Sequence, residues 1–176
     1  MNPTFNKGTW IDAVKMSMPE HVSHLERNLD IAMTKHSLDE IDAHACALAA
    51  AIASGNGELA FEISMNGPLF GRSERELVTQ ATISMSIDTV YLNYLDAVDI
   101  AEYNSTKPHP LEIFEPIMSD ETGKAAAYAF AAAIVLKHSR TFALVDLLKN
   151  RNYTSEQVQD IATIASVVAS INKVVI

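Results

Sequence analysis

Two alanine-rich apolar segments constrain the fold of this chain more than any other feature. The first is ALAAAIASGNGELAFEI, which begins at Ala47, and the second is AFAAAIVLKHSRTFALV, which begins at Ala129. Further along, ATISMSIDTV from Ala81 parallels ATIASVVASINKV from Ala162. Because both pairs occur in the same order, the sequence predicts a duplicated helical unit, with halves at about residues 17–101 and 120–176.

The spacing of the other apolar residues is that of α-helices. Apolar residues recur every three or four positions in two further stretches, at Val22, Leu25, Leu29 and Ala32 and at Leu38, Ile41, Ala45 and Leu48. β-Branched residues seldom alternate with polar ones, so strands are not expected. The sequence therefore predicts an all-α fold, built as a single domain over residues 1–176.

A proline-rich stretch separates the two predicted halves. Half of the six prolines of the chain fall between about residues 102 and 119, at Pro108, Pro110 and Pro116. Proline disfavours helix at its own position and at the residue before it. We therefore expect a connector there, with a short helix around Leu111 to Ile117.

Pairs of residues with capping-box spacing predict where four helices start. In a capping box a hydroxyl accepts from a free backbone N–H, and the residue three positions later bonds back to the cap. The pairs are Ser17 with Glu20, Ser37 with Glu40, Ser73 with Glu76, and Thr154 with Gln157.

Charge and cysteine content narrow the class of protein. The formal net charge is -9, and no cluster of Lys or Arg suggests a nucleic-acid partner. The single cysteine, Cys46, allows no disulfide within the chain, which favours a reducing compartment. No secretory signal and no run of about 18 apolar residues is present, so we expect a cytoplasmic protein without a membrane span.

The last predicted helix suggests self-association. IATIASVVASINKVVI carries no charge from Ile161 until Lys173 and is too short and too rich in Ser and Thr for a membrane helix. Its apolar faces have to be covered, so we expect a homo-oligomer.

Four segments along the chain carry a resemblance to a known family: MPEHVSHLERNL, ALAAAIASGN, ISMSIDTVYLNY and YAFAAAI. Their order and approximate spacing resemble those of the AhpD-like (alkylhydroperoxidase-like) proteins of the carboxymuconolactone decarboxylase superfamily, and the first segment resembles the opening helix of that family. The resemblance covers most of the chain. It implies an AhpD-like helical fold with two related halves, assembled as a trimer or a multiple of one.

The residues that carry the chemistry of the resembled family are replaced in this chain. The family has a Cys-x-x-Cys-x-x-x-His motif, with a glutamate twelve residues before the first cysteine. The four matching positions hold Ala126, His138, Thr141 and Val145. Peroxide reduction needs one thiolate to attack and a second thiol to resolve the product. The resemblance therefore implies that the thiol peroxidase site is lost, and no cofactor or metal is expected.

Three functions remain open at this point. The first is an oligomeric scaffold, or a protein that binds a ligand or a partner. The second is a cysteine-independent lyase or isomerase, which the superfamily also includes, with His138 as general acid or base and Glu121 or Glu156 nearby. The third is an alkyl hydroperoxidase acting through Cys46, although DAHACALAAA predicts a helix interior, where cysteine packs as a small hydrophobe.

The polar cluster Lys137–Thr141 also has a structural interpretation, in which Ser139 or a neighbour caps the next helix and the charges lie in solvent. We favour it over the functional interpretation, which is proton transfer by His138 or anion binding at a helix start. His21 and His24 can share a helix face and hold a metal loosely, but a solvated face is the expected arrangement. The remaining candidates are expected to be structural: His44 faces away from Cys46, His109 lies in a loop, and Tyr91 and Tyr94 pack in the core.

Overall fold

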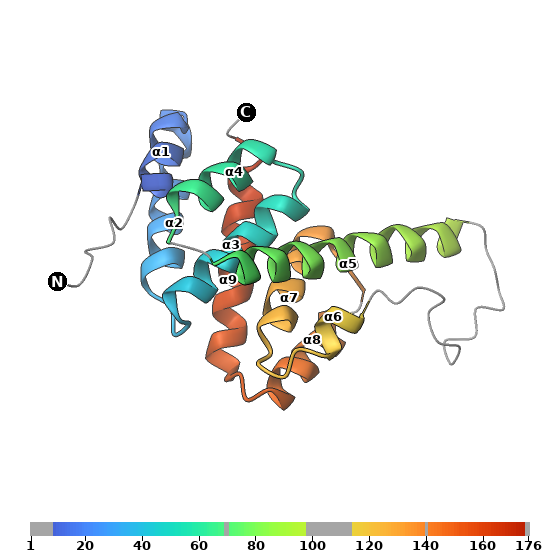
Figure 1. Ribbon diagram of the computed structural model, residues 1–176. Helices are drawn as coiled ribbons and strands as arrows, with labels where there is room; N and C mark the ends of the chain where they lie inside the picture. The colour runs from blue at the N-terminus through green and yellow to red at the C-terminus, as the bar shows by residue number, and fades with distance from the viewer. Residues whose placement is uncertain (1–8, 69–70, 98–113, 140, 175–176) are drawn as a thin grey trace.

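The computed structural model describes residues 9–68, 71–97, 114–139 and 141–174 (Figure 1). Within these ranges the chain forms α-helices and one short 3-10 helix and no strand, so the predicted all-α class is confirmed. The elements are α1 (Thr9–Ser17), η1 (Glu20–Val22), α2 (Ser23–Thr34), α3 (Glu40–Ala53), α4 (Gly57–Asn66), α5 (Arg72–Ala97), α6 (Glu115–Met118), α7 (Lys124–Leu136), α8 (Thr141–Asn150) and α9 (Ser155–Ile171).

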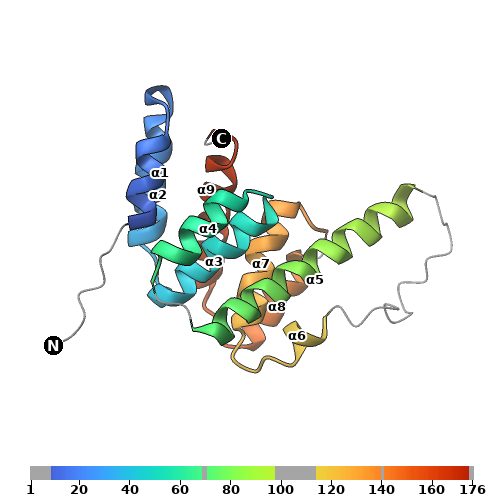
Figure 2. The same cartoon turned by 45° about the horizontal axis from the view of Figure 1, so that its top comes forward.

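The two alanine-rich segments form α3 and α7, which pack against each other at the centre of the fold. Every residue from Ala43 to Ala51 and from Ala125 to Ala133 is buried, so neither helix has a solvent face along these stretches. Alanine favours helix, and its small side chain lets two helix axes approach closely. The long helices α5 and α9 cover the central pair, each contacting both α3 and α7 (Figure 2).

The order of helix types repeats along the chain. An alanine-rich helix, a short helix and a long helix follow one another as α3, α4 and α5 and again as α7, α8 and α9. The sequence parallels fall on matching helices of these two series. That the two halves are related remains a prediction. The helices α1 and α2 precede both series and cover α4 and α9.

The last helix is covered within the chain, which corrects the basis of the oligomer prediction. The apolar residues of α9 face α2, α3 and α7, and its exposed positions in the apolar stretch are Thr163 and Ser166. Another copy is therefore not needed to bury this helix. A different helix, α5, carries the exposed apolar residues considered below.

One of the four predicted capping boxes is confirmed. At the start of α9, the hydroxyl of Thr154 accepts from the backbone N–H of Gln157 at 3.1 Å, and the Gln157 side chain accepts from the N–H of Thr154 at 2.9 Å. The predicted start at Ser17 is wrong, because Ser17 ends α1 and its hydroxyl donates to the carbonyl of Val14. The η1 turn that follows begins at Glu20 without a side-chain cap.

The other two predicted boxes are also wrong. Asp39 caps α3 by accepting from the N–H of Ile41, whereas Ser37 donates from its backbone and its hydroxyl to Asp160 on α9. Ser73 is already the second residue of α5, and its hydroxyl donates to Glu74. Long-range and neighbouring acceptors take these hydroxyls away from the predicted caps.

Most of the predicted connector at about residues 102–119 lies outside the described residues, which end at 97 and resume at 114. The end of the predicted short helix overlaps α6, in which Pro116 occupies the first turn, where no N–H donor is needed. No helix in the described part of the chain has both the length and the apolar character to cross a bilayer.

We expect Ala131→Leu to lower the free energy of unfolding by about 2 kcal/mol, because the added side chain overpacks the centre of the fold. Urea unfolding followed by circular dichroism measures the change. Ala13→Leu, at an exposed position on α1, is the control and should change stability by less than about 0.5 kcal/mol. Equal losses in the two variants would contradict close packing at Ala131.

Candidate functional site

The chain reverses direction at the end of α7, and the side chain of His138 points into the interior of the protein. Lys137 takes a left-handed conformation, with φ 54° and ψ 41°, and the backbone N–H of His138 donates to the carbonyl of Ala133 at 2.9 Å. A left-handed residue at this position ends a helix and reverses the direction of the chain. The His138 side chain is consequently 1% exposed, while Lys137 and Ser139 on either side are more accessible.

The imidazole of His138 meets a buried carboxyl group. Its Nε2 lies 2.8 Å from Oδ2 of Asp88, whose side chain is 0% exposed. Burying either polar group without a partner costs on the order of several kcal/mol. The His138–Asp88 pair thus joins the connection between α7 and α8 to the middle of α5.

A similar polar contact occurs at the matching place in the first helical series. The Nδ2 of Asn172, at the end of α9, donates to the carbonyl of Ser54 at 2.9 Å, and Ser54 lies in the connection between α3 and α4. In each series, therefore, a polar side chain ties the turn after the alanine-rich helix to the long helix of the other series. This correspondence favours a structural role for the His138–Asp88 pair.

The four positions that match the resembled family do not converge on one point. Ala126 is buried in the first turn of α7, whereas His138 follows its last turn. A helix of 13 residues is about 20 Å long. Thr141 and Val145 are half-buried on α8, on the side of the molecule where α7 ends.

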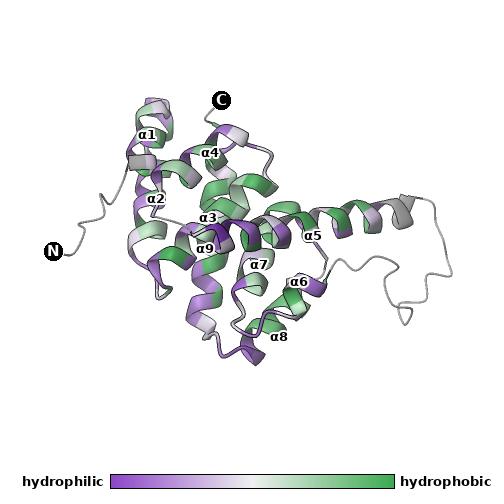
Figure 3. Cartoon of the chain, viewed as in Figure 1, coloured by the Kyte–Doolittle hydropathy of each residue, from purple (hydrophilic) through white to green (hydrophobic). Residues whose placement is uncertain are grey.

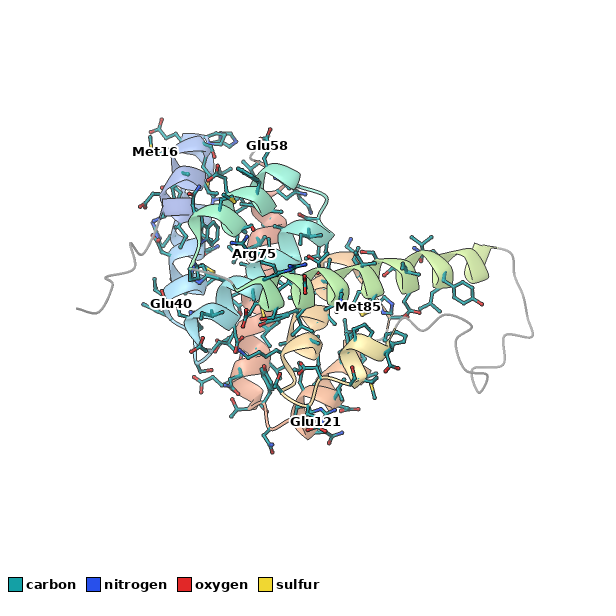
Figure 4. The ribbon with its side chains drawn as sticks, in the orientation of Figure 1. Met16, Glu40, Glu58, Arg75, Met85 and Glu121 are labelled. Carbon is teal, nitrogen blue, oxygen red and sulfur yellow. The ribbon has the colours of Figure 1, made fainter. Side chains whose placement is uncertain are left out.

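The carboxylates expected beside His138 lie elsewhere. Glu121 is exposed just before α7, and Glu156 is exposed in the first turn of α9, so both are at the opposite end of α7 from His138. In Figure 4, Glu121 lies at the edge of the molecule, away from Met85 on α5. Neither carboxylate therefore supplies the partner that the lyase or isomerase alternative asks for beside His138.

Asp88 was not among the predicted site residues. It is the only charged residue between Glu76 and Asp96 in an otherwise apolar and small-polar stretch. An isolated acid on a helix that packs in the core has to find a partner, and this was the signal in the sequence. The partner, His138, lies on a connection that is distant in the sequence, so the local pattern around Asp88 could not identify it.

A cavity of about 490 Å³ lies near the pair, between α5, α6 and α8. Its size is within the range of small-molecule pockets. Neither His138 nor Asp88 lines it. Its walls are formed by Met85, Phe114, Ile117, Met118, Ala143, Leu144, Asp146, Leu147 and Asn150. The cavity can accept an apolar group, but His138 is not among the residues that such a group would contact there.

The single cysteine is buried in α3. Cys46 is 0% exposed, and burial, with a further contribution from Asp42, raises the pKa of its thiol far above the ordinary value. Asp42 itself accepts from the hydroxyl of Tyr128 at 2.9 Å and pairs with the ammonium of Lys124 at 3.0 Å. The raised pKa keeps the thiol protonated near neutral pH, and the one charged group that contributes to the shift, Asp42, is an acid.

The remaining predicted candidates do not form a site. His21 and His24 are both exposed, Tyr91 is half-buried, and His109 and the side chain of Tyr94 lie outside the described residues. Among the residues that the structure describes, no group of three or more His, Cys, Asp or Glu side chains is arranged to hold a metal ion. His44 lines a second cavity, between α1, α2 and the start of α3.

We expect His138→Ala to lower the free energy of unfolding by about 3 kcal/mol, because it removes the imidazole from a fully buried carboxyl group. Asp88→Ala should also destabilise the protein. In the double variant the loss should be smaller than the sum of the two single losses, as a double-mutant cycle in urea measures. Additive losses would contradict a direct interaction, and His24→Ala, at an exposed position, is the control.

Comparison with known proteins adds no assignment to this geometry. No family model matches the chain, and no curated protein matches it significantly.

Proposed function

We propose that this chain is an AhpD-like protein without thiol peroxidase chemistry, which acts as an oligomeric scaffold or as a ligand- or partner-binding protein. The observation that carries the proposal is the setting of Cys46. It is the only cysteine of the chain, it is buried in the central helix pair, and the pKa of its thiol is raised. A reactive thiol needs an accessible, electropositive setting and a resolving partner, and Cys46 has none of these.

The replacement of the family residues supports the same proposal. His138 stands where the resembled family has its first cysteine, and its side chain is paired with Asp88 inside the fold. Val145 and Ala126, at two of the other family positions, carry no titratable group. The residues present at these positions thus favour packing rather than proton or electron transfer.

We assign the interface between copies to the outer face of α5. Ile83, Ile87 and Val90 are 50%, 42% and 69% exposed and follow helical spacing along one face. No charged residue is exposed from Leu77 to Asn93, because Asp88 is buried. Figure 1 shows the second half of α5 extending from the helical body, and Figure 3 shows apolar residues recurring along it.

Charge explains why a second copy suits this face. The chain has a net charge of -9, so most pairs of surfaces from two copies repel each other. An uncharged apolar face paired with the same face of another copy avoids this repulsion and removes apolar area from water. By family resemblance, the assembly is a trimer or a multiple of three.

The enzymatic part of the proposal is tested by hydroperoxide consumption with dihydrolipoamide as reductant. We expect no turnover above the uncatalysed rate in the wild-type protein or in Cys46→Ser, because the buried thiol does not ionise near neutral pH. Turnover that disappears in Cys46→Ser would overturn the proposal and restore the hydroperoxidase alternative.

The interface is tested by Ile87→Glu. We expect the variant to be monomeric in light scattering coupled to size-exclusion chromatography while the wild type is oligomeric, because a carboxylate at the centre of the apolar face is desolvated and repelled by its copies. Met65→Glu makes a comparable change at an exposed apolar position of α4 and should leave the assembly intact. A monomeric wild type would contradict the proposed interface.

A second candidate function is general acid–base catalysis by His138 in a lyase or isomerase. The observation that favours it is the 2.8 Å contact with Asp88, since a carboxyl group commonly orients a catalytic imidazole. Against it, the cavity between α5, α6 and α8 is not lined by His138. A substrate whose turnover is lost in a folded His138→Gln variant would establish it.

A further inference from the structure

A second cavity, of about 270 Å³, lies between α1, α2 and the start of α3. It contains the polar side chains of these helices and of the loop before α3, among them His36 and His44. Figure 4 marks this region by Glu40, which begins α3 and also lines the cavity. The cavity is separate from the His138–Asp88 pair and from the proposed interface on α5.

The imidazole of His44, which lines this cavity, has an unused acceptor. His44 is 7% exposed, and its Nδ1 lies 2.8 Å from the carbonyl oxygen of Glu40. A carbonyl oxygen only accepts, so the proton is assigned to Nδ1 and the lone pair to Nε2. Within the described part of the chain Nε2 has no hydrogen-bond partner, and the ring is held in place by an edge-to-face contact with Trp10.

His36 presents a second acceptor in the same way. Its Nδ1 lies 3.1 Å from the carbonyl oxygen of Leu38, which assigns the proton to Nδ1 and leaves Nε2 as acceptor. Both histidines line the same cavity, and each ring is oriented by a hydrogen bond to a backbone carbonyl. A molecule that enters the cavity thus meets two oriented imidazole acceptors.

The charged side chains around the cavity favour a positively charged ligand. Three acids and one base line it: Asp12, Asp30, Glu40 and Lys15. Lys15 is already paired with Asp30 at 2.5 Å. Among the described residues that line the cavity, Asp12 and Glu40 therefore have no ion-pair partner. Burial lowers the pKa of His44, which keeps the ring neutral and unsuited to binding an anion.

The arrangement fits hydrogen-bond donors better than a metal ion. The described residues hold no group of three or more ligating side chains arranged for a metal. The volume of the cavity also exceeds what one ion needs and admits a small organic molecule.

We propose that this cavity binds a small organic cation with N–H donors, an ammonium or a guanidinium, which donates to Nε2 of His44 and of His36 and lies beside Asp12 and Glu40. This inference does not depend on the absence of thiol chemistry or on the oligomeric state. The N–H groups of the ligand supply hydrogen bonds to the two imidazole acceptors, and its positive charge complements the two carboxylates.

The test is a binding titration of the full-length protein, by calorimetry or NMR, with three probes of similar size. We expect n-butylammonium to bind at least about tenfold more tightly than n-butanol or butyrate, since it alone combines N–H donors with a positive charge. His44→Phe keeps an aromatic ring beside Trp10 but removes the acceptor, and should weaken binding by about tenfold.

Two further variants make the result decisive. His36→Phe tests the second acceptor and does not alter the Trp10 contact, so it remains informative if His44→Phe fails to fold. His24→Phe makes the same substitution at an exposed position outside the cavity and should leave binding unchanged.

Three results would overturn the proposal. One is butyrate binding as tightly as n-butylammonium. Another is n-butylammonium binding that survives both His36→Phe and His44→Phe in folded protein. The last is saturable zinc binding that requires both histidines, without binding of n-butylammonium, which would make the cavity a metal site instead.

Discussion

The close packing of α3 against α7 is the interaction on which the rest of the structure depends. Both helices are buried on every side over nine consecutive residues, from Ala43 to Ala51 and from Ala125 to Ala133. Alanine makes this possible because it fills little space beside the helix axis. Such a centre leaves little room for polar chemistry, so the polar groups that stabilise the fold gather where these helices begin and end. At the starts of α3 and α7, carboxylates cap or face the helix N-termini, as Asp39 and Asp120 do.

At the other end of the central pair, polar side chains of α5 and α9 fix the turns. Asp88 meets His138 after α7, and Asn172 bonds to Ser54 after α3. Each contact holds a turn against a long helix, and each gives a hydrogen-bonding partner to polar groups that are shielded from water. This shared role explains how a histidine can occupy a buried position in a polar cluster without being part of a catalytic arrangement.

Features that depend on local spacing were predictable, and features that depend on distant partners were not. The helical class and the capping box at Thr154 follow from residues three or four positions apart. The same spacing rule failed at Ser37 because the hydroxyl donates to Asp160, a residue brought near only by the fold. The pairing of His138 with Asp88 could not be predicted for the same reason, since the turn at Lys137 and the position of Asp88 depend on the fold. Of the candidate site, the sequence therefore indicated the residue but not its partner.

The packing that makes the fold also determines where binding can occur. Cys46 lies within the alanine-rich centre, where a thiol serves as a small apolar side chain and does not ionise near neutral pH. The polar side chains that line the second cavity, His44 among them, are instead found where α1 and α2 meet the start of α3. His44 itself belongs to α3, within the buried stretch from Ala43 to Ala51, so this cavity borders the central pair. Binding at this edge therefore uses only the first turns of α3, and the remainder of the central pair is devoted to packing.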